Sequence, residues 1–429
     1  MTRWALQVAR ERGHEVVAAL LVGGTEKLRP GEALDIGAPV LSMAGDRMTS
    51  LGAAIATHGP EAVLDLSDEP VLGYRERMEL AAVALSAGLP YLGSDFRLDP
   101  PVRGSPLTVP TIAVIGTGKR TGKTAIAGTL ARLADGMGLR PVVVAMGRGG
   151  PAEPEMVEAG SVGLDLLLRL AREGRHAASD HLEDALTTGV TTIGARRAGG
   201  GLAGAPWASN VREAAELAAG LRPGLVILEG SGSAVPPVPW DAGVLVVPAS
   251  APPEYLSGYL GPFRLLLSEL AVLTMTGDSE RGSENLSALR SCLRRYLGDA
   301  RHVVTDFFPV PLGDVQGRRA FFATTAPEAA AERQVRHLES AHGCIVVGWS
   351  ARLSDRADLE RDLDEADDYD VLLTELKAAA VDVACERASG RGAEVVFVDN
   401  RAETVEGHVT LEAALRSVVD AALVRGGSR

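Results

Sequence analysis

The stretch TIAVIGTGKRTGKT, residues 111–124, decides the fold. It begins as a short apolar run, typical of a buried parallel strand over 111–115, and continues into a loop punctuated by glycines that ends in Gly122-Lys123-Thr124. Apolar residues then recur at helical spacing, at Ile126, Leu130, Leu133 and Met137. A strand, a glycine-rich loop and a helix in this order predict a phosphate-binding P-loop, with the helix N-terminus directed at a polyphosphate.

The loop predicts an ATP site that carries two more positive charges, Lys119 and Arg120, than a nucleotide needs. Lys123 is expected to reach the β- and γ-phosphates, and the Thr124 hydroxyl to ligate Mg²⁺. Five residues separate Gly116 from Gly122-Lys123, a departure from the commonest spacing that resembles ATP-dependent enzymes of the dethiobiotin-synthetase type. The residues expected to bind ATP are Gly116, Thr117, Gly118, Lys119, Arg120, Thr121, Gly122, Lys123 and Thr124, together with Thr276 from a later turn.

Length and composition exclude several classes of protein. The 429 residues suggest two or three domains, and a hydrophobic content of 46% is ample for α/β cores. The formal net charge of −13 argues against a general binder of nucleic acid or of anionic membranes. Three cysteines without metal-like spacing indicate reduced thiols and a cytoplasmic location, and neither a signal peptide nor a membrane-spanning run is evident. A phosphate-rich substrate would therefore need cations concentrated at one place.

Residues 1–107 have the pattern of a small Rossmann-like domain that lacks its first strand. A helix is expected over 2–12, followed by strands at 16–22, 40–42, 62–66 and 89–93 and helices at 50–57 and 74–87. Because such domains usually open with a strand, we expect the native start to lie upstream of Met1, which the intact mass of the native protein would test. No G-x-G-x-x-G fingerprint is present, so no dinucleotide is predicted, and a proline-rich linker follows at 100–110.

Residues 108–300 have the pattern of a P-loop NTPase-type domain built on a parallel sheet, and 301–429 that of a further α/β segment that could continue it. Strands are expected at 141–146, 225–228, 244–247 and 270–275, and then at 320–323, 344–347, 371–373 and 394–398, with a helix over 162–173 among others. The predicted fold class is therefore α/β throughout. In open parallel sheets, ligands bind beyond the carboxyl ends of the strands.

Polar residues follow several of these strand ends. Glu229 ends the strand 225–228 and is expected to hold Mg²⁺ beside the P-loop. Arg148 lies in a glycine-rich turn after the strand 141–146, where a guanidinium can fork onto phosphate. Arg196 and Arg197 precede the glycine triplet 199–201, which predicts a mobile basic lid over phosphates.

Further polar residues have less specific surroundings. His176 and Asp180 are four residues apart and would share one face of a helix, where they could contact phosphate or Mg²⁺; without a third nearby ligand, zinc is not expected. Lys377 stands where a strand gives way to a helix. The charged stretch 65–77 and the stretch 23–27 each follow a strand, and the sequence leaves open whether they belong to a site or to an ordinary surface.

Nine stretches spread over nearly the whole chain support a more specific interpretation. They are GTGKRTGKT at 116–124, AMGRGGP at 145–151, GRHAASD at 174–180, RRAGGG at 196–201, LEGSG at 228–232, FFATTAPE at 321–328 and LLTELKAAAVD at 372–382, with DLSDEPVLGYRER at 65–77 and GGTEKL at 23–28. Together they resemble the cyclic 2,3-diphosphoglycerate synthetase family.

The resemblance implies an ATP-dependent, Mg²⁺-requiring ligase that closes 2,3-diphosphoglycerate into a ring through an intramolecular phosphoanhydride and releases ADP and phosphate. Size and family also suggest a homodimer. Two other interpretations stay open: a carboxylate-activating ligase of the dethiobiotin-synthetase type, and a ParA-like ATPase switch whose output is partner binding.

In the favoured interpretation the catalytic residues are Lys123, Lys119, Glu229 and Arg148, the metal ligands are Thr124 and Glu229, and the substrate contacts are Arg120, Arg148, His176, Asp180, Arg196, Arg197 and Lys377.

Overall fold

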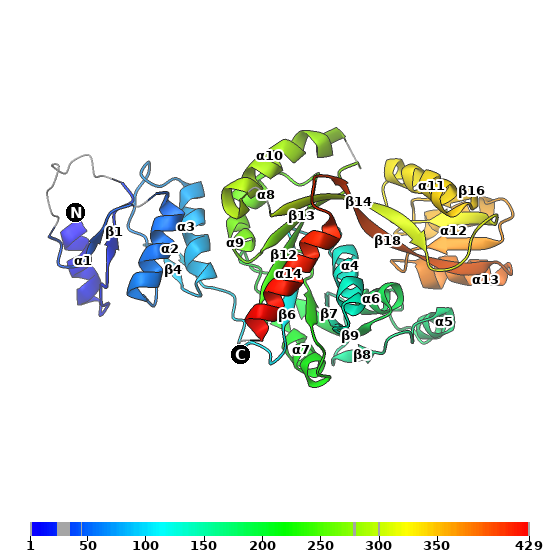
Figure 1. Ribbon diagram of the computed structural model, residues 1–429, viewed down its shortest axis with the longest axis horizontal. Coiled ribbons are helices and arrows are strands. Elements are labelled where there is room, and N and C mark those ends of the chain that lie inside the picture. The colour runs from blue at the N-terminus through cyan, green and yellow to red at the C-terminus, as the bar shows by residue number, and fades with distance from the viewer. Residues whose placement is uncertain (1, 24–34, 44, 278–279, 299–300, 428–429) are drawn as a thin grey trace. The chain divides into compact units, whose positions relative to one another are not determined.

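The computed structural model of the chain describes residues 2–23, 35–43, 45–277, 280–298 and 301–427 (Figure 1). The chain divides into two compact units. Unit 1 comprises Met1–Pro101 and Pro253–Leu267, and unit 2 comprises Val102–Pro252 and Ser268–Arg429. The chain therefore leaves unit 2 once and returns to it.

Unit 1 combines a small parallel sheet and a small mixed sheet with helices. Its strands are only two residues long: β1 (Ala19–Leu20) pairs in parallel with β2 (Val40–Leu41), and β4 (Tyr91–Leu92) lies between β3 (Val63–Leu64) and β5 (Arg97–Leu98). The helices are α1 (Thr2–Glu11), α2 (Arg47–His58) and α3 (Tyr74–Ser86), joined by α8 (Glu254–Ser257) and α9 (Gly261–Leu266) from later in the chain. The stretch 23–27 lies outside the described residues except for Gly23.

Unit 2 is built on one long mixed sheet whose first half is parallel around the P-loop strand. The order is β10-β9-β7-β11-β6-β12-β13-β14, and β6 (Thr111–Gly116) occupies a central position with all of its residues buried. Its partners are β11 (Val226–Glu229) and β12 (Ala242–Pro248), and the other strands of this half are β7 (Val142–Gly147), β8 (Glu155–Val157), β9 (Thr191–Ala198), β10 (Ala208–Ser209) and β13 (Leu270–Thr274). The predicted parallel P-loop sheet is confirmed.

Helices cover both faces of this half, and the last helix of the chain belongs to its core. They are α4 (Lys123–Gly136), α6 (Asp180–Thr188), α7 (Val211–Gly220), α10 (Glu280–Leu297) and α14 (Leu411–Gly426). The helix α5 (Leu164–Arg172) packs instead against the π-helix Ala380–Cys385 of the second half. Leu415 and Val419 of α14 are buried in one cluster with Ile112 and Val114 of β6 and Ile126 of α4. The C-terminus thus returns to the P-loop strand, as Figure 1 shows.

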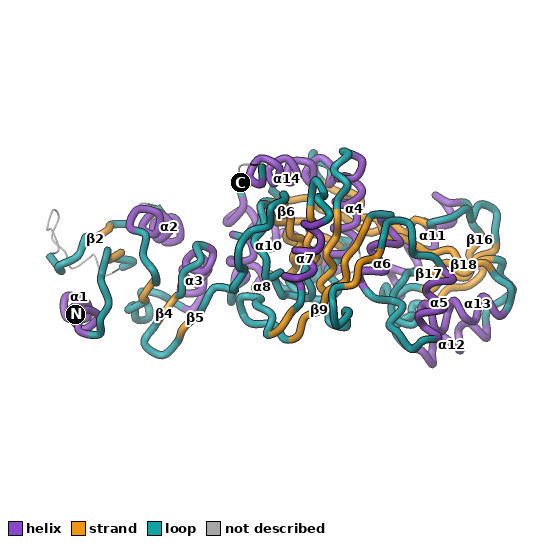
Figure 2. The backbone as a smooth tube through the Cα atoms, turned by 90° about the horizontal axis from the view of Figure 1, so that it is seen from below, coloured by secondary structure: helices purple, strands orange, loops and turns teal. Residues whose placement is uncertain are grey.

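The second half of the sheet continues through two long antiparallel strands, β14 (His302–Pro311) and β18 (Glu394–Glu406). Beyond them lie β17 (Val371–Thr374), β15 (Arg319–Ala323) and β16 (Ile345–Ser350), which pair in parallel. The helices α11 (Glu328–His342), α12 (Arg356–Glu365) and α13 (Glu386–Gly390), with the π-helix Ala380–Cys385, surround these strands (Figure 2). The sequence had not indicated β14. Within the described ranges, no helix is long and apolar enough to cross a membrane.

Candidate active site

The strands beside β6 hold the P-loop in place. The backbone N–H of Thr117 donates to the carbonyl oxygen of Val246 on β12 at 3.3 Å. At the end of β13, the hydroxyl of Thr274 donates to the carbonyl oxygen of Thr121 at 2.8 Å. The loop is therefore anchored at the carboxyl edge of the sheet, where the sequence placed it.

Gly122 makes the tight turn from the loop into α4. Its φ is +90°, and a Cβ at this position would lie 2.2 Å from a ring atom of Phe307. Only glycine fits such a position. No side chain caps the helix here, so the backbone N–H groups of the first turn of α4 remain available to a phosphate.

Lys123 lies buried under the loop. Its Nζ donates to the carbonyl oxygen of Gly118 at 2.8 Å and to the hydroxyl of Thr121 at 3.2 Å. Burial lowers the pKa of Lys123 to about 8, although the carboxylate of Glu229 opposes this shift. A buried cation enclosed by loop atoms is suited to meet the β- and γ-phosphates of a nucleotide.

Thr124 and Glu229 meet at the position expected for a magnesium ion. Because β11 is the parallel neighbour of β6, Glu229 lies beside the loop, and the Thr124 hydroxyl donates to Glu229 Oε1 at 2.6 Å. Glu229 Oε2 is buried and has no hydrogen-bond partner among the described residues. Burial, then the charge of Asp180, raises the pKa of Glu229. An unsatisfied carboxylate oxygen next to a P-loop threonine fits the oxygen-rich coordination that Mg²⁺ prefers.

The carboxylate of Asp184 also lies beside Glu229, and our reading of the sequence missed it. Asp184 is only 1% exposed, and both of its carboxylate oxygens lack a hydrogen-bond partner in the described part of the chain. Burial, followed by the charge of Glu229, raises its pKa well above the usual value. The available signal was its spacing of four from Asp180, which puts both carboxylates on one face of α6.

Three cations gather at Gly232, in the loop after β11. A Cβ placed on Gly232 would lie 3.0 Å from Arg197 Nη2, 3.7 Å from Lys119 Cγ and 3.8 Å from Arg148 Nη2. Arg197 is buried and donates to the carbonyl oxygen of Ser231 at 2.7 Å, while burial, with Arg148 nearby, lowers its pKa. Three of the predicted basic residues, far apart in the sequence, thus surround one small backbone position at the P-loop.

The prediction of a mobile basic lid at 196–201 was wrong. Arg196 and Arg197 belong to β9, which pairs with β7 as far as Arg196 and with β10 at Arg197 and Ala198. Successive residues of a strand point to opposite faces, so only Arg197 faces the cluster at Gly232. Arg196 is exposed on the other face, and its backbone N–H donates to Asn210 Oδ1 at 2.7 Å. The glycine triplet had suggested a hinge, but Arg196 is paired with β7 and Arg197 with β10 before the glycines begin.

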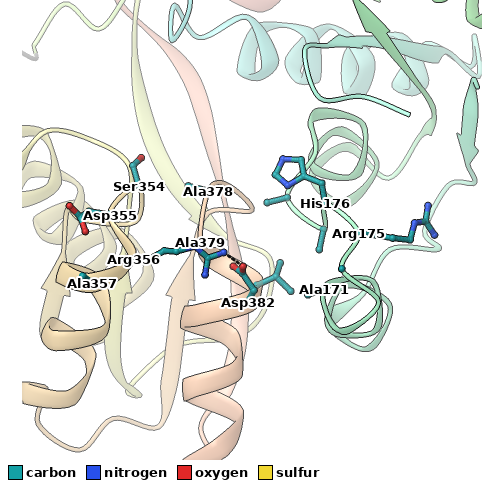
Figure 3. Close-up of a pocket in the computed structure, with 14 residues that line it drawn as sticks. Ala171, Arg175, His176, Ser354, Asp355, Arg356, Ala357, Ala378, Ala379 and Asp382 are labelled. Carbon is teal, nitrogen blue, oxygen red and sulfur yellow. Dashed lines mark hydrogen bonds and ion pairs between the residues drawn. The ribbon is translucent and has the colours of Figure 1, made fainter. Parts of the chain in front are cut away.

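His176 and Asp180 do not share a helix face, because α6 begins at Asp180. Asp180 lies near the P-loop: its Oδ2 would be 3.5 Å from a Cβ on Gly147. His176 is exposed and lines a different cavity of about 750 Å³, formed by 174–178, 354–357, 378–379, 381 and 382 with Ala171 (Figure 3). Across that cavity Arg356 pairs with Asp382.

The remaining predicted residues have the following surroundings. Lys377 forms an ion pair with Glu183 of α6 at 3.1 Å. The hydroxyl of Thr276 faces the carbonyl oxygen of Thr305 at 3.4 Å. Arg120 is exposed in the loop, with a left-handed φ of +56°. Their contacts with ATP or substrate stay predictions.

No group of three or more histidine, cysteine or acidic side chains among the described residues has the geometry of a metal site, so a bound Mg²⁺ would depend on Thr124, Glu229 and phosphate oxygens.

Family models cover almost the full length of the chain. The N-terminal domain of cyclic 2,3-diphosphoglycerate synthetase matches residues 1–99, its P-loop domain 111–305 and its C-terminal domain 311–401. The described site lies in the P-loop match, and the chain is therefore a P-loop protein of the α/β class.

Relatives agree with these matches. The chain is 48% identical over 396 residues to cyclic 2,3-diphosphoglycerate synthetase of Rubrobacter xylanophilus, covering 92% of this chain and 89% of the relative. It is 40% identical over 435 residues to that of Methanothermobacter thermautotrophicus, covering 99% and 94%. Among solved structures, LpxK from Aquifex aeolicus in complex with ATP matches with a TM-score of 0.42 at 15% identity, covering 74% of this chain and 90% of that one. By its domain matches and its relatives, the chain belongs to the cyclic 2,3-diphosphoglycerate synthetase family.

Proposed function

We propose that the chain is an ATP-dependent ligase that closes 2,3-diphosphoglycerate into a cyclic phosphoanhydride and releases ADP and phosphate. The observation that carries this proposal is the gathering of Lys119, Arg148 and Arg197 around Gly232, at the edge of the P-loop. The family to which the chain belongs supports the product, and the P-loop domain supports ATP as the energy source. We also propose a homodimer, which sedimentation would test.

The nucleotide binds on the P-loop and the start of α4. The backbone N–H groups of the first helical turn contact its phosphates, and Lys123 leaves Gly118 and Thr121 to reach the β- and γ-phosphates. Thr124 and Glu229 hold the Mg²⁺ ion of the nucleotide. When bound, this ion neutralises charge on the β- and γ-phosphates during transfer.

The second substrate needs the basic cluster because of its own charge. With two phosphates and a carboxylate, 2,3-diphosphoglycerate carries about five negative charges near neutral pH. Closing it into a ring brings the phosphates together, and their repulsion must be offset by cations placed in advance. Arg148 and Arg197 can each fork onto phosphate oxygens, and Lys119 adds a point charge from inside the ATP loop.

Ring closure takes two transfers in this mechanism. In the first, an oxygen of one substrate phosphate attacks the γ-phosphorus of ATP, the bond to the β-phosphate oxygen breaks, and ADP leaves. In the second, an oxygen of the other substrate phosphate attacks the inner phosphorus of the new diphosphate. The anhydride bond made in the first step breaks, inorganic phosphate leaves with its electron pair, and the ring is complete. Lys123 and the cluster at Gly232 stabilise the charge that develops in both steps.

The origin of the oxygens in the released phosphate tests this sequence. In the two-step mechanism the fourth oxygen of the phosphate comes from the substrate, so a reaction in heavy-oxygen water yields phosphate without the heavy label. Label from water in the released phosphate would show that ATP is hydrolysed and would contradict the mechanism.

Phosphate release with and without 2,3-diphosphoglycerate separates the three interpretations. We expect release to depend on this substrate. Turnover that is independent of any phosphorylated acid would favour an ATPase switch. Turnover stimulated by a plain carboxylic acid would favour a ligase of the dethiobiotin-synthetase type.

A further inference from the structure

Asp184 is a buried carboxylate whose surroundings in the protein do not satisfy it. It is the fifth residue of α6, it is 1% exposed, and neither of its carboxylate oxygens has a hydrogen-bond partner among the described residues. A buried polar group without partners costs free energy, and a buried charge costs more. Such a residue is therefore expected to meet a group that the protein itself does not supply.

The position of α6 directs Asp184 toward the P-loop. The helix packs against α4, β7 and β9, next to the strand that carries Glu229. Asp184 and Glu229 interact electrostatically, and Glu229 Oε2 likewise has no partner in the described part of the chain. Glu229 Oε2 and the two Asp184 oxygens thus accept no hydrogen bond from an N–H or hydroxyl group of the described residues, while Thr124 donates to the remaining oxygen of Glu229.

The nearest cations of the chain are engaged elsewhere. Lys123 donates to Gly118 and Thr121 of the loop, at 2.8 Å and 3.2 Å. Lys377 pairs with Glu183, the residue before Asp184, at 3.1 Å. Asp184 and Glu229 also interact through a side-chain hydrogen bond, which requires their carboxyl groups to share a proton. A cation with its bound waters can take the place of that proton between the two groups.

We propose that Asp184 is the second carboxylate of the magnesium site, where it accepts hydrogen bonds from the water molecules that the ion keeps. Mg²⁺ usually retains several waters, and those waters are strong donors because the ion polarises them. Asp184 has two free acceptor oxygens for such waters, while Glu229 and Thr124 lie closer to the P-loop. The inference rests on the proposed function only in taking the P-loop as a site for a metal–nucleotide complex.

Binding of Mn²⁺ in the presence of ADP, followed by electron paramagnetic resonance, tests the proposal without requiring turnover. We expect Asp184→Asn to weaken Mn²⁺ binding about 10-fold or more, as the loss of an outer-shell partner does at other metal sites. The control is Asp165→Asn on α5, an exposed carboxylate whose replacement should leave Mn²⁺ affinity unchanged. Binding of ADP without metal should be the same in all variants.

The melting temperature of the metal-free protein separates this role from a purely structural one. Asp184→Asn keeps the shape of the side chain and removes a buried charge, so we expect a melting temperature equal to or above that of the wild type. A lowered melting temperature with unchanged Mn²⁺ affinity would overturn the proposal. Should the asparagine variant fail to fold, Asp184→Ala is measured in its place, with the same expected loss of Mn²⁺ affinity and the same contradicting result. If the wild type itself binds no Mn²⁺ with ADP, the proposed function fails, and this inference with it.

Discussion

Two buried glutamates, Glu229 and Glu375, end parallel strands in the two halves of one sheet, and their surroundings differ. Glu375 follows β17 and accepts hydrogen bonds from the hydroxyls of Thr324 and Thr325, the second at 2.8 Å, and from the Asn400 amide at 3.0 Å. Glu229 is the last residue of β11 and accepts one hydrogen bond, from the Thr124 hydroxyl at 2.6 Å. Its other oxygen has no partner among the described residues.

From this difference we infer a structural role for Glu375 and propose a functional one for Glu229. Both residues are almost fully buried, at 3% and 5% exposure, and both stand where a parallel sheet presents ligand sites. The oxygens of Glu375 are occupied by donors from two neighbouring segments, the loop after β15 and the strand β18, so this residue ties the strands of the second half of the sheet together. The free oxygen of Glu229, together with those of Asp184, leaves capacity for a cation. The count of unsatisfied acceptors, rather than burial or position in the sheet, distinguishes the two.

Replacing Glu229 should have the largest effect on activity. Glu229→Gln removes the charge that holds Mg²⁺, and we expect the rate of ring formation to fall at least about 100-fold. Because the substitution removes a buried charge, the melting temperature should not fall. Steady-state kinetics measure the rate, and thermal denaturation measures the melting temperature. A Glu229→Gln variant that loses stability but keeps its rate would show that Glu229 has a structural role.

Replacing Glu375 should lower the stability of the protein and affect the rate of ring formation less. Glu375→Gln removes the charge and turns one of the two acceptor oxygens into an amide donor, which then faces either Thr325 or both Thr324 and Asn400. We expect this mismatch to cost about 1–3 kcal/mol of stability. The rate per folded molecule should change less than that of the Glu229 variant. Denaturant unfolding followed by activity at low temperature checks this, and an unaltered stability would contradict the structural role.

The two exposed arginines Arg148 and Arg196 test the basic cluster with a matched pair. Arg148 lies within the cluster at Gly232, whereas Arg196 points away from it on β9. We expect Arg148→Ala to raise the KM for 2,3-diphosphoglycerate about 10-fold or more, the usual cost of a charged hydrogen bond, with little change in the KM for ATP. Arg196→Ala should change neither constant appreciably. If both substitutions raised the KM for 2,3-diphosphoglycerate equally, the cluster at Gly232 would not be the binding site of this substrate.

The smallest effect is expected at Lys377, which connects the second half of the sheet to α6. Lys377→Met and Glu183→Gln, alone and together, form a double-mutant cycle, and a partly exposed pair should show a coupling of about 1 kcal/mol or less in stability. If the ion pair is the role of Lys377, its replacement leaves the KM for 2,3-diphosphoglycerate within about a factor of three. A larger rise in this KM would support the direct substrate contact that the sequence suggested.

Local sequence patterns predicted the strand, loop and helix of the P-loop correctly, while the contacts of its residues with a nucleotide stay predictions. The strand, loop and helix at 111–137 follow one another in the chain, so the placement of Lys123 and Thr124 depends on neighbouring residues alone. Glu229 could be added because the carboxyl ends of parallel strands meet at one edge of a sheet. The contact of Glu229 with Thr124 bears out that reasoning.

Features that depend on strand order could not be read in the same way. The meeting of Lys119, Arg148 and Arg197 at Gly232 requires β7 to lie next to β11 and β9 next to β7, which no local pattern indicates. The lid prediction failed because it relied on the glycines after Arg197, which suggested a hinge. The run before them forms a strand, and the prediction did not take this into account. Asp184 was overlooked because an acidic residue on a short helix normally faces solvent.

A phosphorus NMR spectrum of the reaction with ATP and 2,3-diphosphoglycerate tests the central claim most directly. We expect the two phosphate resonances of the substrate to be replaced by a coupled pair typical of a cyclic pyrophosphate, while ADP and inorganic phosphate appear in equal amounts. The Glu229→Gln protein should give neither change on the same timescale. Consumption of ATP with the resonances of 2,3-diphosphoglycerate unaltered would contradict the claim.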